Sequence, residues 1–196
     1  RDCDFETCKG IADFFAGIVD YKSEFTGKHS LGVAKKAAEL AEYMGYSQAD
    51  IEKFYMAGAL HDIGKMAIGN EILEKPGRLT DEEFSRMKNH AGYTYMILSE
   101  VKDFDEVRDW AALHHEKLDG TGYPFGKKAE ELNEPERLMA CVDIYQALTE
   151  ARPYKSGMSH DKACSILEDM VQKGWIDAAV TDKLRSCFEV GGRDMV

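Results

Sequence analysis

Residues 51–65 read IEKFYMAGALHDIGK, and they set the expectation for the whole fold. Apolar side chains recur through this stretch at helical spacing, and Ser47 with Asp50 is typical of a helix start. The pattern predicts a helix whose C-terminal end carries His61 and Asp62. Because neighbouring side chains on a helix point about 100° apart, the two can face adjacent centres, as a bridging carboxylate beside a histidine does.

Lys65 follows this pair and would place a cation on nearly the same face as His61 if the helix continued. The alternative is ordinary helix capping, in which the histidine and the aspartate close the helix and the lysine complements the helix dipole. The short motif alone does not separate these two interpretations.

Helical spacing also dominates the rest of the chain. Apolar residues repeat every three or four positions between residues 31 and 41, and Thr80 with Glu83 predicts a capping box for a helix that contains His90. Further helices are expected at residues 107–113, 135–143 and, as two closing helices, within 160–196. No segment shows the strict alternation of a strand, and no internal repeat is present. The predicted fold class is all-α.

The chain has 196 residues, a length typical of one domain with a continuous core. Lys and Arg number 25 against 36 Asp and Glu, which gives a formal net charge of −11. This charge argues against a general binder of DNA or RNA, because most of the surface would repel a phosphate backbone. Any phosphate is therefore expected to be bound locally, by metals and a few cations.

The five cysteines form no CxxC pair, which suits a reducing compartment, and a cytoplasmic location is expected. No apolar run approaches the roughly 18 residues of a membrane span, and the N-terminus has no export signal. The first residue is Arg1 rather than Met. We therefore expect the chain to be a segment of a longer protein, with a sensor or receiver domain upstream.

A second cluster, His114, His115 and Glu116, precedes the glycine-rich stretch 119–124. A single histidine near a helix end is more often a hydrogen-bonded structural group than a metal ligand. However, five of the six histidines precede helix ends, begin helices or neighbour a carboxylate, and none lies in a Ser/His/Asp or Cys/His motif. This joint pattern favours a shared site for two divalent ions over independent structural roles. The candidate ligands are His29, His61, Asp62, His90, His114, His115 and Asp143.

Imidazole and carboxylate ligands without thiolates suit Fe or Mn and, less selectively, Zn, Ni or Co. Two such ions about 3.5 to 4 Å apart can share a bridging hydroxide and stabilise both the attacking and the leaving oxygen at phosphorus. Hydrolysis of a phosphoester is the reaction that most needs this arrangement, so it is the leading functional hypothesis.

Two further segments are either plain loops or parts of the same site. The stretch DGTGYP at 119–124 has the composition of a turn, but it could also form one lip of the site and present Tyr123 for stacking or hydrogen bonding. Arg152 and Lys155 belong to a run that would by default be a solvated loop. Beside a metal pair, Arg152 could bind a phosphate through two hydrogen bonds and Lys155 could add a point charge.

Four segments occur in a distinctive order: HDIGK at 61–65, KPGRLTDEEF at 75–84, HHEKLDGTGYP at 114–124 and VDIYQALTEARPYK at 142–155. With this combination the chain resembles the HD-GYP domains, a bacterial branch of the HD metal-dependent phosphohydrolases. The resemblance runs from about residue 29 to residue 159. It lies within one expected domain of residues 1–196, in which 1–28 form an N-terminal helix and 160–196 form the closing helices.

The resemblance implies a helical bundle with a metal site in its core and the glycine-rich GYP loop at the mouth of that site. It also implies hydrolysis of cyclic di-GMP, a bacterial second messenger, to pGpG and in many members onward to GMP. The seven candidate ligands would hold the metals, and the catalytic residues would be Asp62, which bridges the two ions, and Lys65, which lies near the scissile phosphate. Tyr123 would line the pocket, and Arg152, Lys155 and Lys65 would hold the substrate.

Three positions depart from the family pattern. Phe25 stands where some members carry a glutamate ligand for a third metal, which favours a two-metal centre here.

Two alternative functions stay open. Because base choice depends on pocket residues that one sequence does not identify, one alternative is hydrolysis of another cyclic or linear dinucleotide, such as a cyclic GMP-AMP. Gln146 and Ala151 replace aspartates that are frequent in the family. They support the other alternative, a signalling module that binds the nucleotide, or a partner such as a diguanylate cyclase, with little turnover.

Overall fold

Short polar side chains mark where several helices begin. Ser47 accepts a hydrogen bond from the backbone N–H of Asp50, and Thr80 forms the predicted capping box with Glu83. Asn133 opens a later helix with a capping box of the same kind. Such caps satisfy backbone donors that have no partner inside the helix. The two helix starts predicted at Ser47 and Thr80 are confirmed.

The computed structural model describes residues 4–22, 28–151 and 156–189, and these ranges contain helices and no β-strand. In chain order the α-helices are α1 Phe5–Lys22, α2 His29–Tyr43, α3 Gln48–Leu60, α4 Asn70–Leu73, α5 Asp81–Ser99, α6 Asp105–Ala112, α7 Glu134–Thr149, α8 His160–Gln172 and α9 Ala178–Phe188. Two short 3-10 helices are η1 Ile63–Ala67 and η2 Ala129–Glu131. The predicted all-α class is confirmed. Within the same ranges, no helix has the length and apolar character needed to cross a membrane.

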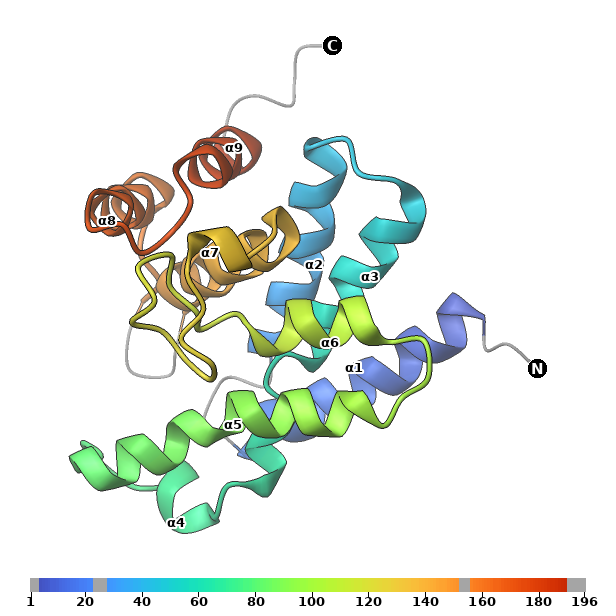
Figure 1. The fold of residues 1–196 in the computed structure, drawn as a ribbon, viewed down its shortest axis with the longest axis vertical. Helices are drawn as coiled ribbons and strands as arrows, with labels where there is room; N and C mark the ends of the chain where they lie inside the picture. The colour runs from blue at the N-terminus through green and yellow to red at the C-terminus, as the bar shows by residue number, and fades with distance from the viewer. Residues whose placement is uncertain (1–3, 23–27, 152–155, 190–196) are drawn as a thin grey trace.

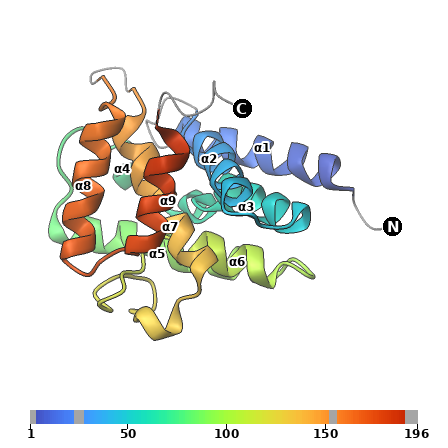
Figure 2. The same cartoon turned by 90° about the horizontal axis from the view of Figure 1, so that it is seen from above.

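Helix α7 lies between the closing helices α8 and α9 on one side and helices α2 and α6 on the other (Figure 1). It contacts α2, α3 and α6, and it also contacts α8 and α9, which pack against each other as the closing helices (Figure 2). The middle of α7 is buried, and it carries Asp143. This aspartate therefore lies where helices that are distant in the sequence come together.

Helices α2 and α3 pack closely because small residues face each other between them. A Cβ added to Gly58 would lie only 2.5 Å from Cα of Ala34, so only glycine permits this approach. Phe54 stacks on Trp110 with ring centroids 4.4 Å apart, which joins α3 to α6. As a result, the start of α2 lies beside the end of α3, and the rings of His29 and His61 have centroids 5.4 Å apart.

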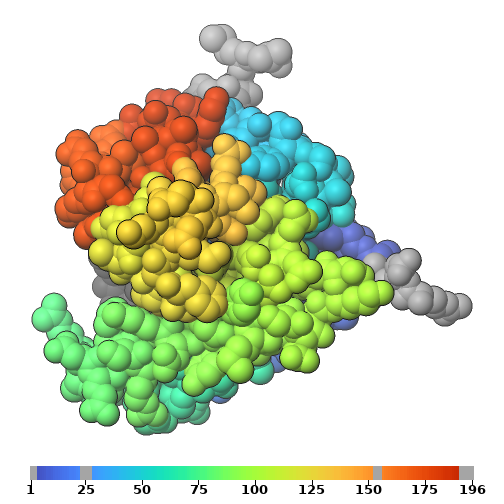
Figure 3. All heavy atoms as spheres, in the orientation of Figure 1, coloured from blue at the N-terminus to red at the C-terminus, as the bar shows by residue number. Residues whose placement is uncertain are grey.

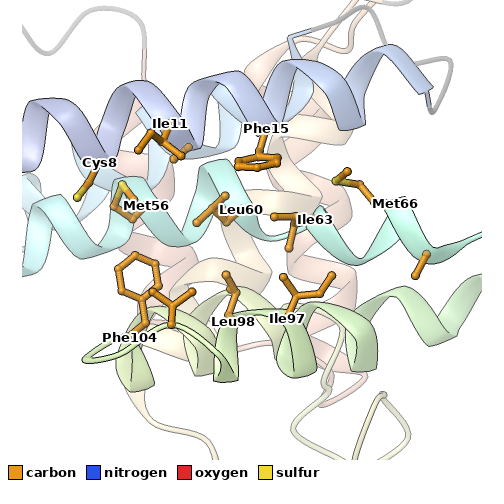
Figure 4. A pocket seen from close by; sticks show the side chains of 13 residues that line it. Cys8, Ile11, Phe15, Met56, Leu60, Ile63, Met66, Ile97, Leu98 and Phe104 are labelled. Atoms are coloured by element: carbon orange, nitrogen blue, oxygen red, sulfur yellow. The ribbon is translucent and has the colours of Figure 1, made fainter. Parts of the chain in front are cut away.

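An apolar groove of about 690 Å³ lies between α1 and α5 (Figure 4). Phe15 of α1 and Ile97 of α5 face each other across it, and Leu60 and Ile63 lie between them. None of the described residues that line the groove is charged, and none is a candidate metal ligand. The groove therefore separates the N-terminal helix from α5 without reaching the predicted site.

Candidate metal centre

The structure brings together all seven side chains that the sequence offers as metal ligands. They come from the start of α2, the junction of α3 with η1, the middle of α5, the segment after α6 and the middle of α7. Their nitrogen and oxygen atoms form three overlapping groups, and within each group the atoms lie within 4.8 Å of one another. The groups are His29 with His61 and Asp143, His61 with Asp62 and His114, and His90 with His114 and His115. The overlap makes one continuous cluster.

Three of the histidines are held by their own helices. The Nδ1 atoms of His61, His90 and His114 donate to backbone carbonyls three residues earlier, at 2.7, 2.7 and 2.6 Å. These bonds place a proton on Nδ1 and direct each Nε2 toward the cluster, where it can bind a metal when it carries no proton. Each of the three Nε2 atoms is buried, and none has a hydrogen-bond partner among the described residues.

These three nitrogen atoms fit a metal centre. A buried polar atom without a partner is rare, because its desolvation cost is not recovered. Here the three Nε2 atoms share the cluster with the carboxylates of Asp62 and Asp143. Imidazole and carboxylate together suit first-row divalent metals, and an Nδ1–H bond to a carbonyl is a common support for a ligating histidine.

His29 is oriented by carboxylates instead. Its Nδ1 lies 3.0 Å from Oε2 of Glu150, and its Nε2 lies 3.1 Å from Oδ1 of Asp143. The side-chain amide of Gln146 also donates to Oε2 of Glu150, at 3.1 Å. Glu150 is absent from the residues predicted from the sequence; it follows the last residue of α7, seven positions after Asp143. Gln146 carries an amide in place of the carboxylate that is frequent in the family, and Glu150 brings a carboxylate to the same part of the site.

Asp62 lies between the two halves of the cluster. Its Oδ1 is 3.3 Å from Nε2 of His90 and 3.9 Å from Nε2 of His114. Its Oδ2 is 3.4 Å from Nε2 of His61 and accepts a hydrogen bond from Nζ of Lys65 at 2.7 Å. The sequence suggests that Lys65 would lie near His61 if the α-helix continued, but the helix does not continue. The α-helix ends before the pair, and the tighter turn of η1 brings the ammonium group back to Asp62.

Two hydrogen bonds to Thr94 of α5 hold the turn that carries His61 and Asp62. Oγ1 of Thr94 accepts from the backbone N–H of Gly64 at 3.0 Å and donates to the carbonyl of His61 at 3.0 Å. Gly64 packs directly on the backbone of α5, because an added Cβ would lie 1.9 Å from the carbonyl oxygen of His90. This close approach brings the end of α3 within reach of His90.

Glu116 organises the glycine-rich loop beside the cluster. Its buried carboxylate accepts hydrogen bonds from the backbone N–H groups of Phe125, Gly126 and Lys127, at 2.7, 3.1 and 2.9 Å. The ring of Tyr123 stacks on that of His115, with centroids 4.7 Å apart. The loop therefore lies against a candidate ligand, as its interpretation as a lip of the site requires. Sequence analysis assigns no such anchoring role to Glu116.

Burial and charge divide the histidines into two classes. Burial lowers the pKa of His115 to about 4 and also lowers the pKa values of His90 and His114. Burial acts in the same direction on His29 and His61, but neighbouring carboxylates outweigh it. They raise the pKa of His29 to about 9 and hold the pKa of His61 well above its usual value. For Asp62, burial opposes ionisation, yet the neighbouring lysine and histidine charges hold its pKa well below the usual value. The carboxylate is therefore ionised at neutral pH.

Metal uptake at His29 is expected to release a proton. Because its pKa is raised from 6.5 to about 9, the metal-free ring is protonated at pH 7, whereas only a neutral imidazole binds a metal. Affinity should rise by at least about tenfold per pH unit below pH 9, because His61, whose pKa is also raised, must lose a proton as well. Conversely, the charged ring of His29 stabilises the metal-free fold below pH 6.5, and this contribution is lost as the pH rises through about 9.

Calorimetric titration with Mn(II) in buffers of different ionisation enthalpy measures this proton count. Glu150→Gln removes one of the carboxylates that raise the pKa of His29. When this variant binds Mn(II) at pH 7, it should therefore release fewer protons than the wild type. Equal proton release from both proteins would contradict the expectation.

Three residues discussed from the sequence lie outside the described ranges. They are Phe25 and the expected phosphate-binding pair, Arg152 and Lys155. Ala151, which is described, is exposed. Their roles remain as predicted from the sequence.

Comparison with known proteins gives matches along most of the chain. A family model described as HD domain matches residues 13–180. The 3'3'-cGAMP-specific phosphodiesterase 1 of Vibrio cholerae is 38% identical over 177 residues, which cover 90% of this chain and 41% of the relative. A cyclic di-GMP phosphodiesterase of the same organism is 40% identical over 167 residues, covering 78% of this chain and 34% of the relative. The chain thus spans less than half the length of these two relatives.

A solved structure shares the fold. It is an HDG"Y"P protein from Bdellovibrio bacteriovorus, and it matches with a TM-score of 0.67 at 18% sequence identity. The match covers 93% of this chain and 64% of that chain. At this identity the likeness concerns the arrangement of helices alone.

Proposed function

This chain belongs to the HD-GYP branch of the HD domain family, and from that premise we propose that it is a metal-dependent phosphodiesterase of cyclic dinucleotides. The observation that carries the proposal is the set of three buried Nε2 atoms, from His61, His90 and His114, around Asp62. The principal substrate proposed is cyclic di-GMP, which would be opened to pGpG and then cleaved further to GMP.

Two divalent ions are proposed as cofactors, with Fe or Mn preferred over Zn, Ni or Co. The two ligand sets would be His29, His61 and Asp143 for one ion and His90, His114 and His115 for the other, with Asp62 shared. When bound, such a pair lowers the pKa of a shared water and neutralises charge on the phosphate.

The remaining residues of the site orient and shield the reacting groups. Lys65 keeps Asp62 ionised, and its ammonium group is close enough to the cluster to contact a phosphate oxygen. The loop anchored by Glu116 covers His115 through Tyr123, which limits the access of bulk water from that side. Arg152 and Lys155 are proposed to bind phosphate, Arg152 through paired hydrogen bonds and Lys155 through its charge.

A second candidate substrate is 3'3'-cGAMP. The relative that matches 90% of this chain carries that specificity in its name, whereas the other reported relative is named for cyclic di-GMP. Metals and cations recognise the phosphate, which both nucleotides share, so the ligand cluster itself supports either. The choice must depend on residues that contact the second base.

Turnover of a nucleotide panel tests both proposals. Protein purified anaerobically and loaded with Fe(II) or Mn(II) is incubated with cyclic di-GMP, 3'3'-cGAMP and cyclic di-AMP, and the products are separated by chromatography. Formation of pGpG or GMP from cyclic di-GMP is expected. A higher kcat/KM on 3'3'-cGAMP would make that nucleotide the preferred substrate. If all three nucleotides stay intact with either metal, the enzyme assignment fails, and tight binding in a calorimetric titration would then favour a signalling module.

A further inference from the structure

A second cavity adjoins the metal centre on the outer side of the GYP loop. It has a volume of about 680 Å³ and lies between α5 and the segment 123–125. On the face shown in Figure 3, the green surface of α5 lies directly below the yellow surface of the segment that follows α6. Tyr123 belongs to both places, because its ring stacks on His115 and also lines the cavity. One aromatic ring therefore separates the cavity from a candidate metal ligand.

Helix α5 contributes residues to the metal cluster from one face and residues to the cavity from another. His90 is buried in the cluster, whereas Lys88 and Gly92 line the cavity. Residues four apart lie on the same face of a helix, and the residue midway between them points to the opposite side. The cavity and the metal cluster therefore lie against opposite faces of α5, and the ring of Tyr123 borders both.

The cavity combines aromatic faces with polar groups. Tyr95 and Phe125 line it and meet edge to face with centroids 5.1 Å apart. Nζ of Lys88 lies 4.9 Å from the centroid of the Phe84 ring and 5.7 Å from that of the Tyr123 ring, and Lys88 forms no ion pair with any described residue. The amide of Asn89 is exposed beside it. Stacking surfaces with a few convergent hydrogen-bonding groups are typical of pockets that bind a nucleobase.

We propose that this cavity is a base subsite that selects a guanine of the cyclic dinucleotide, with Lys88 as the discriminating residue. The inference rests on the proposed function, because it presupposes that the phosphate lies at the metal cluster. A lysine ammonium offers donors and no acceptor. On the edge that carries N7, guanine presents two acceptors, N7 and O6, whereas adenine presents one acceptor beside the N6 donor. Lys88 is therefore matched to guanine and mismatched to adenine.

Lys88→Met tests the discrimination. This change keeps the length of the side chain and removes its charge, so kcat/KM for cyclic di-GMP should fall roughly tenfold to a hundredfold, as for the loss of a charge-assisted hydrogen bond. The value for cyclic di-AMP should change much less, so that the preference for guanine narrows. A general loss of folding or metal binding would lower both values together. The matched control is Arg86→Gln, which removes a positive charge from the same helix outside the cavity and should leave both values near those of the wild type.

Gly92→Leu tests the cavity itself. A Cβ at this position would meet only Cβ of Pro124, at 3.9 Å, so a larger side chain can enter the cavity without a backbone clash. The substitution also replaces a glycine inside a helix, which favours the helix. We expect a KM for cyclic di-GMP raised at least about tenfold, with metal content and melting temperature retained.

The two assignments can fail separately. If the wild-type protein cleaves none of the cyclic dinucleotides, the proposed function is wrong. If the wild type cleaves cyclic di-GMP while Lys88→Met and Gly92→Leu retain its rate, its KM and its preference over cyclic di-AMP, the phosphodiesterase assignment stands and the base subsite is wrong.

Discussion

Replacing Asp62 with asparagine is expected to lower phosphodiesterase turnover by at least about 10³-fold while the helical content is retained. Among the residues that the structure describes, Asp62 is the one whose carboxylate oxygens approach His61, His90 and His114 together. Asparagine preserves the shape of the side chain but removes the charge that two adjacent cations would share. The loss should therefore appear in both metal content and kcat, and His61→Ala should behave in the same way.

Metal analysis and circular dichroism, alongside turnover, check this prediction. The metal content per chain should fall, whereas the far-ultraviolet spectrum should match that of the wild type. Asp109→Asn is a suitable control, because this aspartate is partly exposed, pairs with Arg108 and does not contact the cluster. An Asp62→Asn protein with full metal content and wild-type turnover would remove the carboxylate from the mechanism.

Gly64→Ala is expected to destabilise the fold by about 3 kcal/mol or more and to weaken metal binding. The added methyl group would collide with backbone atoms of α5, at 1.9 Å from the carbonyl oxygen of His90 and 2.5 Å from the amide nitrogen of Thr94. Backbone atoms cannot rotate away as a flexible side chain can, so η1 must separate from α5. That movement would break both hydrogen bonds of Thr94 and carry His61 away from His90.

Thermal denaturation of the metal-free protein measures this effect. For a chain of this length, about 3 kcal/mol corresponds to a fall in melting temperature of roughly 6 to 12 °C. Gly10→Ala provides the matched control, because Gly10 lies in α1 with nothing within 4 Å of an added Cβ. The control should be neutral or more stable by about 0.5 to 1 kcal/mol. Equal melting temperatures for Gly64→Ala and the wild type would show that the contact between η1 and α5 can relax.

The elements that sequence analysis predicts well are those determined by nearby residues. The starts of α3 and α5 follow from Ser47 and from the pair Thr80 and Glu83, whose hydrogen bonds span only three positions. The position of His61 at the end of α3 follows from the apolar period before it. Periodicity and capping are local properties, so one sequence is enough to identify them.

The convergence of the seven side chains is a different kind of prediction. It depends on the order of the motifs and on the joint pattern of histidines and carboxylates along the chain. Pattern alone does not reveal the partners that support them. Glu150 contacts His29 across 121 positions, and Thr94 bonds to His61 across 33. Such contacts arise from the packing of α2, α5 and α7, which no local pattern specifies. Lys65 shows the same limit, since its contact with Asp62 depends on the chain tightening into η1.

The tethered rings of His61, His90 and His114 have a consequence for how the protein meets a changing supply of ions. Each ring is aligned by a carbonyl of its own backbone, so its orientation is set by folding and not by the ion that arrives. One ion can then be exchanged for another without refolding, and imidazole donors accept several transition metals, so that metal availability as well as affinity decides occupancy. Which metal fills the centre would thus follow the relative abundance and oxidation state of metals around the protein, so that the same polypeptide could work at different rates as those conditions change.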